Sequence, residues 1–190
     1  MIAGALFCLL AFSATVNAQT KYQSAGGVKL VIEGTSNIHD WDMSSDKGSV
    51  TAVFEVNNSG VPTGLNILNF SVPAESLKSE HKAMDKNTYK ALATDKYNAI
   101  SFTASSATIK PVNASNYILI AKGKLTISGV TKDVVLTANG IVNPDKSITY
   151  SGSYQLKMTD YNVTPPTIMF GSIKTGNAIT VKFNLVLKSI

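Results

Sequence analysis

Residues 117–140 read YILIAKGKLTISGVTKDVVLTANG. Successive side chains of a β-strand point to opposite faces, so apolar or small residues at every second position predict a half-buried strand. The stretch contains two such runs, one on either side of a turn at Ser128-Gly129, and we expect them to pair as an antiparallel hairpin. The inward positions are Tyr117, Leu119, Ala121, Gly123, Leu125 and Ile127, followed by Val134, Leu136, Ala138 and Gly140.

The same alternation recurs elsewhere in the chain and predicts eight strands in all. Only residues 79–93 break it with good helix formers at helical spacing, with Ser79 as the expected N-cap, so we expect one short helix between the third and fourth strands. The stretch 157–177 is too irregular for a strand. No linker or repeat interrupts the pattern, which predicts one domain. The six other strands are expected at residues 28–33, 50–56, 68–72, 100–104, 148–156 and 179–188.

Eight antiparallel strands can close into a barrel or stack as a sandwich. Closure is favoured because it removes exposed strand edges, and an eight-stranded barrel is wide enough for one slim ligand. Several inward positions are small, which would leave space in the lumen. Alternatively, small residues fit the taper of a filled barrel. These positions are Ala52, Ala104, Ala121, Gly123, Ala138, Gly140 and Gly152.

The cations of this 190-residue chain are 17 lysines, without one arginine, against 12 acidic residues, which gives a net charge of +5. Arginine is the residue that recognises guanine and phosphate through two parallel hydrogen bonds, so its absence argues against a nucleic-acid reader and against phosphoryl transfer. Most aromatic residues fall on the apolar faces, where they cannot stack on bases. We therefore expect no nucleic-acid partner and no tight binding of a pyrophosphate group.

Residues 1–18 have the features of a secretory signal peptide. They carry no charge, include a short apolar segment and end in Val16-Asn17-Ala18, a small-residue cleavage pattern. The apolar run is too short for a membrane-spanning helix, so no integral membrane span is expected. Cleavage would leave a domain of residues 19–190 in the periplasm or outside the cell. That domain would contain no thiol, because Cys8 is the only cysteine.

Catalytic and metal-binding patterns are weak. His39 lies near Asp40 and Asp42, but no H-x-H or H-x-x-x-H spacing is present, and a polar turn with a structural histidine is the favoured interpretation. We therefore predict no catalytic residue, no metal and no enzymatic activity. The alternative is an exported hydrolase or metal-dependent enzyme that uses these three residues.

Four stretches of the sequence carry a family pattern when they are taken in order: residues 34–41, 84–102, 123–132 and 158–171. Together they resemble the YceI-like family in the form common in Bacteroidetes. The resemblance covers nearly all of the chain after the leader. It implies a lipocalin-like barrel whose lumen takes a long apolar chain, such as a polyprenyl lipid or a quinone with an isoprenoid tail. It also implies an exported, non-enzymatic carrier.

In such a barrel the ligand would be a small apolar lipid, with an isoprenoid lipid or quinone bound in place of any cofactor. A weakly polar head group fits the all-lysine charge best. A homodimer is compatible with this kind of barrel, and a filled barrel acting only as an interaction module is a further alternative. We expect the wall at Phe70, Phe102, Leu119, Leu136, Tyr154, Leu156 and Phe183, and the entrance near Met84, Tyr89, Leu92, Met169 and Phe170.

Overall fold

The computed structural model describes residues 18–190, and the predicted signal peptide lies almost entirely outside the described residues. One antiparallel sheet curls round and closes on itself, because the last strand pairs with strands at both ends of the sheet order. The strands are β1 (Ala18–Ser24), β2 (Val28–Ser36), β3 (Trp41–Val56), β4 (Pro62–Pro73), β5 (Ala99–Pro111), β6 (Asn116–Ile127), β7 (Val130–Val142), β8 (Ile148–Lys157), β9 (Thr167–Ile168) and β10 (Ile173–Ser189).

Around the barrel the order is β10-β2-β3-β4-β5-β6-β7-β8, and the β8–β10 pairing completes the circle. The predicted eight-stranded antiparallel barrel is therefore confirmed. The predicted strands correspond to β2 to β8 and β10. The sequence did not predict β1 and β9. Strand β1 pairs with both β3 and β10 beyond the end of β2, so β1 and β2 together fill one position in the barrel.

The hairpin of β6 and β7 has the turn that its sequence predicts. Ile127 pairs with Val130, so the loop has only two residues. Ser128 and Gly129 both have positive φ, 48° and 75°, as in a type I′ turn, whose twist matches that of the flanking strands. Glycine at the second position adopts this conformation without the clash that a Cβ would cause.

The chain between β4 and β5 forms a 3₁₀ turn, η1 (Ala74–Ser76), and the helix α1 (Lys82–Leu92). A helix was predicted here over residues 79–93, and it is found three residues shorter at its start. The N-cap is His81 rather than Ser79, and Ala93 ends the helix in the left-handed conformation. A second 3₁₀ turn, η2 (Met158–Tyr161), follows β8 within the stretch predicted as irregular.

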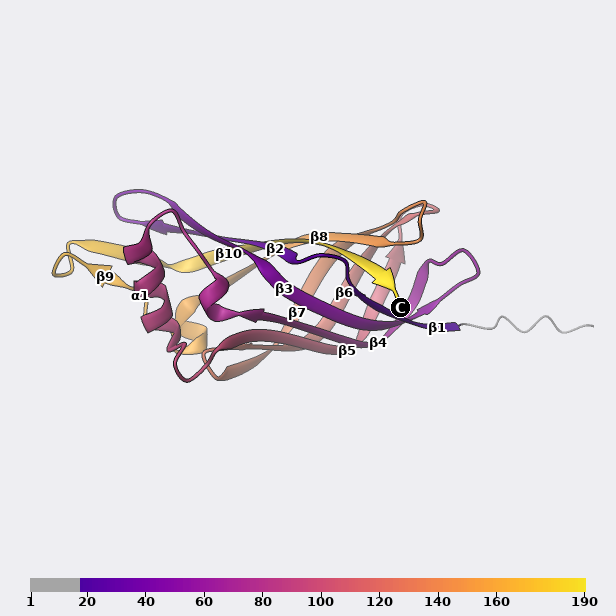
Figure 1. The fold of residues 1–190 in the computed structure, drawn as a ribbon, viewed down its shortest axis with the longest axis horizontal. Coiled ribbons are helices and arrows are strands. Elements are labelled where there is room, and N and C mark those ends of the chain that lie inside the picture. The colour runs from indigo at the N-terminus through magenta and orange to yellow at the C-terminus, as the bar shows by residue number, and fades with distance from the viewer. Residues whose placement is uncertain (1–17) are drawn as a thin grey trace, which may run out of the picture.

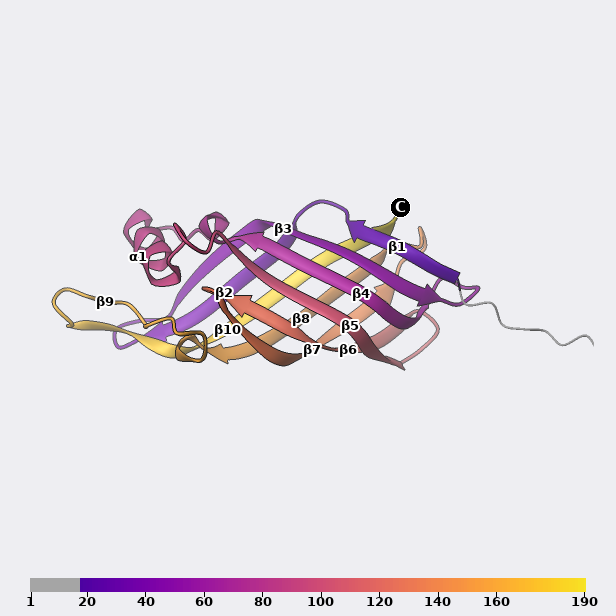
Figure 2. The same cartoon turned by 90° about the horizontal axis from the view of Figure 1, so that it is seen from below.

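Figure 1 and Figure 2 show the barrel from two directions, and in both views α1 and the hairpin of β9 with β10 lie at one end. Strand β1 and the C-terminus lie at the other end. No helix in residues 18–190 has the length and hydrophobicity needed to cross a membrane. The apolar positions of the strands point into the barrel, where they form one buried cluster.

Candidate functional site

The barrel encloses a cavity of about 490 Å³. This is within the range of about 300–1,000 Å³ that small-molecule sites occupy. An engineered apolar cavity of about 150 Å³ in another protein stays dry and binds benzene, and the cavity here is roughly three times that volume. Its wall comes from the inward positions of every strand from β2 to β8 and of β10, and α1 covers part of one end.

Nine of the twelve side chains expected at the wall or entrance line this cavity. They come from six strands and from α1, because each stands at an inward position of an alternating strand or on the barrel-facing side of the helix. The nine are Phe70, Met84, Leu92, Phe102, Leu119, Leu136, Tyr154, Leu156 and Phe183.

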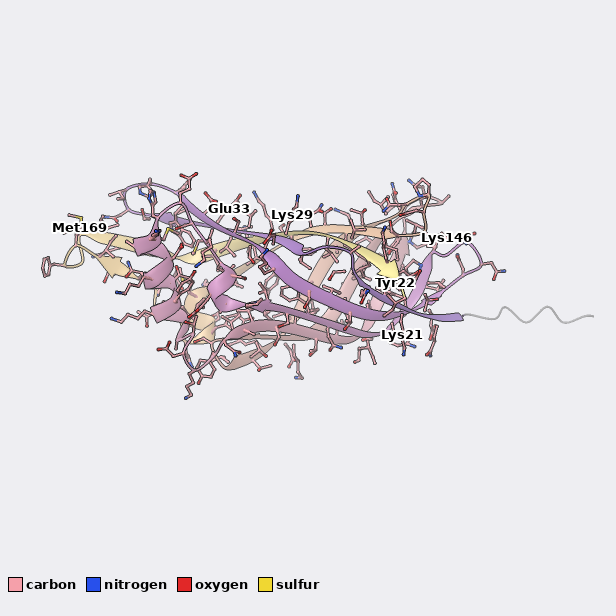
Figure 3. All side chains as sticks on the ribbon, viewed as in Figure 1. Lys21, Tyr22, Lys29, Glu33, Lys146 and Met169 are labelled. Carbon is pink, nitrogen blue, oxygen red and sulfur yellow. The ribbon has the colours of Figure 1, made fainter. Side chains whose placement is uncertain are left out.

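The other three expected residues lie elsewhere. The Tyr89 hydroxyl is within 2.9 Å of the carbonyl oxygens of Glu75 and Leu77, so this side chain ties α1 to the preceding turn. Met169 and Phe170 stand at the tip of the β9–β10 hairpin, at the α1 end of the barrel, where Figure 3 labels Met169. Both side chains point into solvent and do not line the cavity.

Most of the wall that β2 and β10 supply was not predicted, and Phe183 is the one predicted residue from these two strands. Both strands were predicted from their alternation, so their other inward residues could have been predicted from the same signal. The missed residues include Leu30 and Ile32 of β2 and Ile179, Val181 and Leu185 of β10.

The inward glycines do not leave open space, so that prediction was wrong. An aromatic ring lies over each of them, at a distance where an added Cβ would clash. A Cβ added to any of these glycines would lie only 2.5–2.6 Å from the nearest ring atom. Space comes instead from alanines that line the cavity, Ala121 and Ala138. The covered pairs are Phe102 over Gly123, Tyr117 over Gly140 and Phe183 over Gly152.

Four aromatic residues close the end of the barrel away from α1. Tyr22, labelled in Figure 3, meets Phe54 edge-on with ring centroids 5.8 Å apart, and Phe54 stacks on Tyr150 at 6.2 Å. Tyr150 meets Tyr117 edge-on at 6.0 Å, and their hydroxyl groups hydrogen-bond to each other. Burial raises the pKa of both hydroxyls, so each stays protonated. We call this set the aromatic floor.

The polar side chains that line the cavity come from the loop after β2, from α1 and from the start of β10, at the opposite end. We call this end the mouth. No lysine and no carboxylate is among the lining residues of the described chain. Any ligand head group at the mouth would therefore meet hydroxyl, amide and imidazole groups. These are Ser36, His39, His81, Asn87, Thr88 and Thr175.

Helix α1 is fixed at the mouth by a buried carboxylate. Asp85 accepts hydrogen bonds from the backbone N–H of Ser79 at 2.7 Å and from its hydroxyl at 2.8 Å. Burial by itself would raise the pKa of Asp85, but these two hydrogen bonds, with Lys78 and His81 nearby, outweigh it and hold the pKa below its ordinary value. Asp85 is thus held as a carboxylate that orders the start of the helix.

The loop that joins β2 to β3 is attached to the β9–β10 hairpin. Asn37 donates its side-chain amide to the carbonyl of Ser172 at 2.9 Å and accepts from the N–H of Lys174 at 2.7 Å. Trp41 lines the cavity beside this loop and donates its indole N–H to the carbonyl of Thr35. Segments more than 130 residues apart therefore form one side of the mouth.

His39, Asp40 and Asp42 are not brought together as a catalytic or metal-binding group. A ring nitrogen of His39 is 2.7 Å from the backbone oxygen of Asp40. Asp42 is exposed and alternates with the inward residues Trp41 and Met43, so it points away from the cavity. Within residues 18–190, no group of three His, Cys, Asp or Glu side chains is placed to hold a metal ion.

A sequence profile of the YceI-like domain matches residues 13–187. The chain belongs to the YceI-like family. The resemblance seen in four stretches of the sequence thus extends across the whole barrel. Among curated protein sequences, none matches this chain significantly.

Solved structures share the fold of this YceI-like protein at low sequence identity. A polyisoprenoid-binding domain from Saccharophagus degradans, implicated in plant cell wall breakdown, has a TM-score of 0.67 and 12% identity, covering 89% of this chain and 98% of its own. BcnA from Burkholderia cenocepacia has a TM-score of 0.65 and 18% identity, covering 84% and 95%. The YceI protein of Campylobacter jejuni has 0.53 and 21%, covering 76% and 84%.

Proposed function

We propose that this YceI-like barrel is a non-enzymatic binding protein that holds a long apolar ligand for storage or transport. The ligand class is a polyisoprenoid, an isoprenoid quinone or a related lipid. The observation that carries the proposal is the enclosed apolar cavity, which ends at the aromatic floor and has its polar residues, without lysine or carboxylate, at the mouth. The polyisoprenoid-binding domain with the same fold supports the choice of ligand class.

Apolar burial would supply most of the binding free energy. Each Å² of apolar surface removed from water contributes about 25 cal/mol, so a ligand of several isoprene units has a large favourable term from which ordering costs are subtracted. The absence of lysine from the lining of the described residues favours a weakly polar head, since a buried pyrophosphate would need cations beside it. A quinone ring or a hydroxyl fits the six polar side chains of the mouth better.

The proposal includes export. Its support is the leader pattern of residues 1–18, with a carrier placed in the periplasm or outside the cell after cleavage. A water-filled compartment between lipid sources is where a carrier that shields an apolar chain is useful.

Native mass spectrometry of freshly purified protein, followed by organic extraction, tests the proposal. We expect an apolar mass that stays bound in the gas phase and is recovered in the extract. The same spectrum shows whether the protein is one copy or two. Protein that is empty in every preparation, with no extractable lipid, would contradict the proposed function.

A lumen variant links the bound mass to the cavity. Ala138 points into the cavity, so Ala138→Leu would add bulk there, and we expect it to lower affinity by roughly 5- to 150-fold, the equivalent of about 1–3 kcal/mol of overpacking. Val135, on the same strand, points outward and is half exposed, which makes Val135→Leu the matched control. Equal loss of ligand in both variants would place the ligand outside the lumen. Glycine positions are unsuitable for this test because rings already cover them.

A further inference from the structure

The tip of the β9–β10 hairpin exposes large apolar side chains without any internal reason to do so. Phe170 is fully exposed (111%) and Met169 is 68% exposed. Neither contributes to the cavity or to the buried cluster of the barrel. Exposed apolar groups that gather at one place mark contact sites for other molecules, whereas single scattered ones do not.

The backbone at this tip makes the choice of residues more unusual. Met169 and Phe170 both have positive φ, 52° and 54°, and the N–H of Gly171 donates to the carbonyl of Ile168 at 3.2 Å. Turns with two left-handed central residues ordinarily carry Asn-Gly, because side chains with a Cβ are strained there. The turn at Ser128-Gly129 follows that preference in its second residue. Turn chemistry therefore does not account for a Met-Phe pair.

The exposed tip is continuous with the apolar cavity. Ile168 and Ile38 line the cavity and are also 42% and 56% exposed to solvent. The hydrogen bonds of Asn37 hold the loop that contains Ile38 against the hairpin. Met169 and Phe170 directly follow Ile168 in the chain, so the exposed tip adjoins the apolar wall of the cavity. We call these four residues the apolar rim.

Positive charge accompanies the rim at the same end of the barrel. Lys82, Lys86 and Lys90 follow one another at four-residue spacing along α1, on the side away from the cavity, and all three are exposed. None of them takes part in the ion pairs found in residues 18–190, and neither does Lys174 of the hairpin. Exposed aromatic and aliphatic groups beside unpaired lysines fit the interface of an anionic lipid bilayer, which takes up both.

We propose that the mouth docks on an anionic membrane surface, with Met169 and Phe170 inserted at the level of the lipid head groups. The open end of the cavity then faces the acyl region, so an apolar ligand passes between bilayer and lumen along the rim without crossing water. The transfer step rests on the proposed function, while the docking step can be measured without it.

Flotation with vesicles of phosphatidylethanolamine and phosphatidylglycerol tests the docking. We expect wild-type protein to bind these vesicles and to bind pure phosphatidylcholine vesicles more weakly. Replacing Met169 and Phe170 by serine (M169S/F170S) should weaken binding by at least about 10- to 100-fold, since burying one large apolar side chain contributes about 1.5–3 kcal/mol. Raising salt from about 0.1 M to about 1 M shortens the screening length from about 10 Å to about 3 Å and should weaken the lysine contribution.

Val112→Ser is the matched control. Val112 is 62% exposed, and its turn lies against the β7–β8 turn at the far end of the barrel, where Figure 3 labels Lys146. We expect this variant to bind vesicles like the wild type. Absent wild-type binding, or equal binding by M169S/F170S, would overturn the docking. A wild-type dimer that M169S/F170S converts to monomer, without vesicle binding, would also overturn it and assign the rim to contact between two copies.

The bound lipid separates this proposal from the proposed function. Met169 and Phe170 do not line the cavity, so M169S/F170S should retain a co-purified lipid in native mass spectra but exchange it with vesicles more slowly than wild type. Protein without any lipid that still needs Met169 and Phe170 to float would contradict the carrier and leave the docking in place. Lipid-loaded protein that does not bind vesicles would contradict only the docking.

Discussion

The two ends of the barrel are built from the same strands, yet they differ in how completely they are shielded from water. At the aromatic floor, Phe54 is entirely buried and each ring meets another ring. At the mouth, a short helix and two loops cover the opening, and the apolar rim stays exposed. Regions with few buried contacts open at lower free-energy cost than the core of the same domain. We therefore expect the floor to contribute more to stability than the mouth, and under the proposed function a ligand would exchange at the mouth.

The largest expected effect is at the floor. Phe54→Ala would remove a ring that contacts Tyr22 and Tyr150 and leave a cavity, which should lower the free energy of unfolding by about 3–5 kcal/mol. Urea denaturation followed by circular dichroism measures this. A loss below about 1 kcal/mol would show that the floor is not the stable end.

The hydrogen-bonded pair of Tyr117 and Tyr150 gives a second test of the stability of the floor. Tyr150→Phe would leave the Tyr117 hydroxyl buried without its partner, at a cost of about 1–3 kcal/mol. The double variant Tyr117→Phe/Tyr150→Phe removes both polar groups, so we expect it to be more stable than the sum of the single variants predicts. A double-mutant cycle by urea denaturation measures the coupling. Strictly additive effects would mean that the hydroxyl pair contributes nothing beyond two independent groups.

A smaller effect is expected at the mouth from Asp85→Asn. Losing the charge weakens the hydrogen bonds from Ser79, and we expect about 1 kcal/mol of destabilisation at pH 7. The folded-state pKa of Asp85 lies below its unfolded value of about 3.9, so its contribution is present above that pH and is lost as the pH falls through the folded-state pKa. The difference between wild type and variant should therefore be constant from neutral pH down to about pH 5 and shrink below about pH 4.

Glu80→Gln is the control for Asp85→Asn. Glu80 is an exposed carboxylate next to Ser79, and its replacement should change the free energy of unfolding by less than about 0.5 kcal/mol. If both variants lose stability equally, the effect would come from net charge and not from the Ser79 contact.

The smallest effect on stability is expected at the tip. Phe170→Ala removes a side chain that is fully in solvent, so the free energy of unfolding should change by less than about 0.5 kcal/mol. Phe170→Ala and Phe54→Ala are the same substitution at opposite ends of the barrel, and urea denaturation measures both. A loss above about 2 kcal/mol would show that the tip packs on the barrel and would remove the contrast between the ends.

Much of the fold follows from local sequence pattern. The alternation in residues 117–140 predicts both strands and the turn between them, and it also predicts their inward faces. The helix is predicted from the break in that alternation, although its start is predicted three residues too early, because Ser79 bonds to Asp85 instead of starting the helix. Strand β9 has two residues, too few for a period to be visible.

The candidate site was predictable only in part. The two-residue period of a strand shows which side chains point into the barrel, which is why nine of the predicted residues line the cavity. It does not say how far a ring reaches across the barrel or what it covers. Phe183 lies over Gly152 of the neighbouring strand, where pattern alone suggested open space.

By itself, the sequence determined eight of the ten strands, their apolar inward faces and the single α-helix, since these depend on neighbours along the chain. Only the tertiary structure decided that the barrel is hollow, that one end is sealed by Tyr117 and Tyr150, and that the apolar rim borders the opening. Those properties depend on distances between residues far apart in the sequence, which side-chain periodicity does not encode.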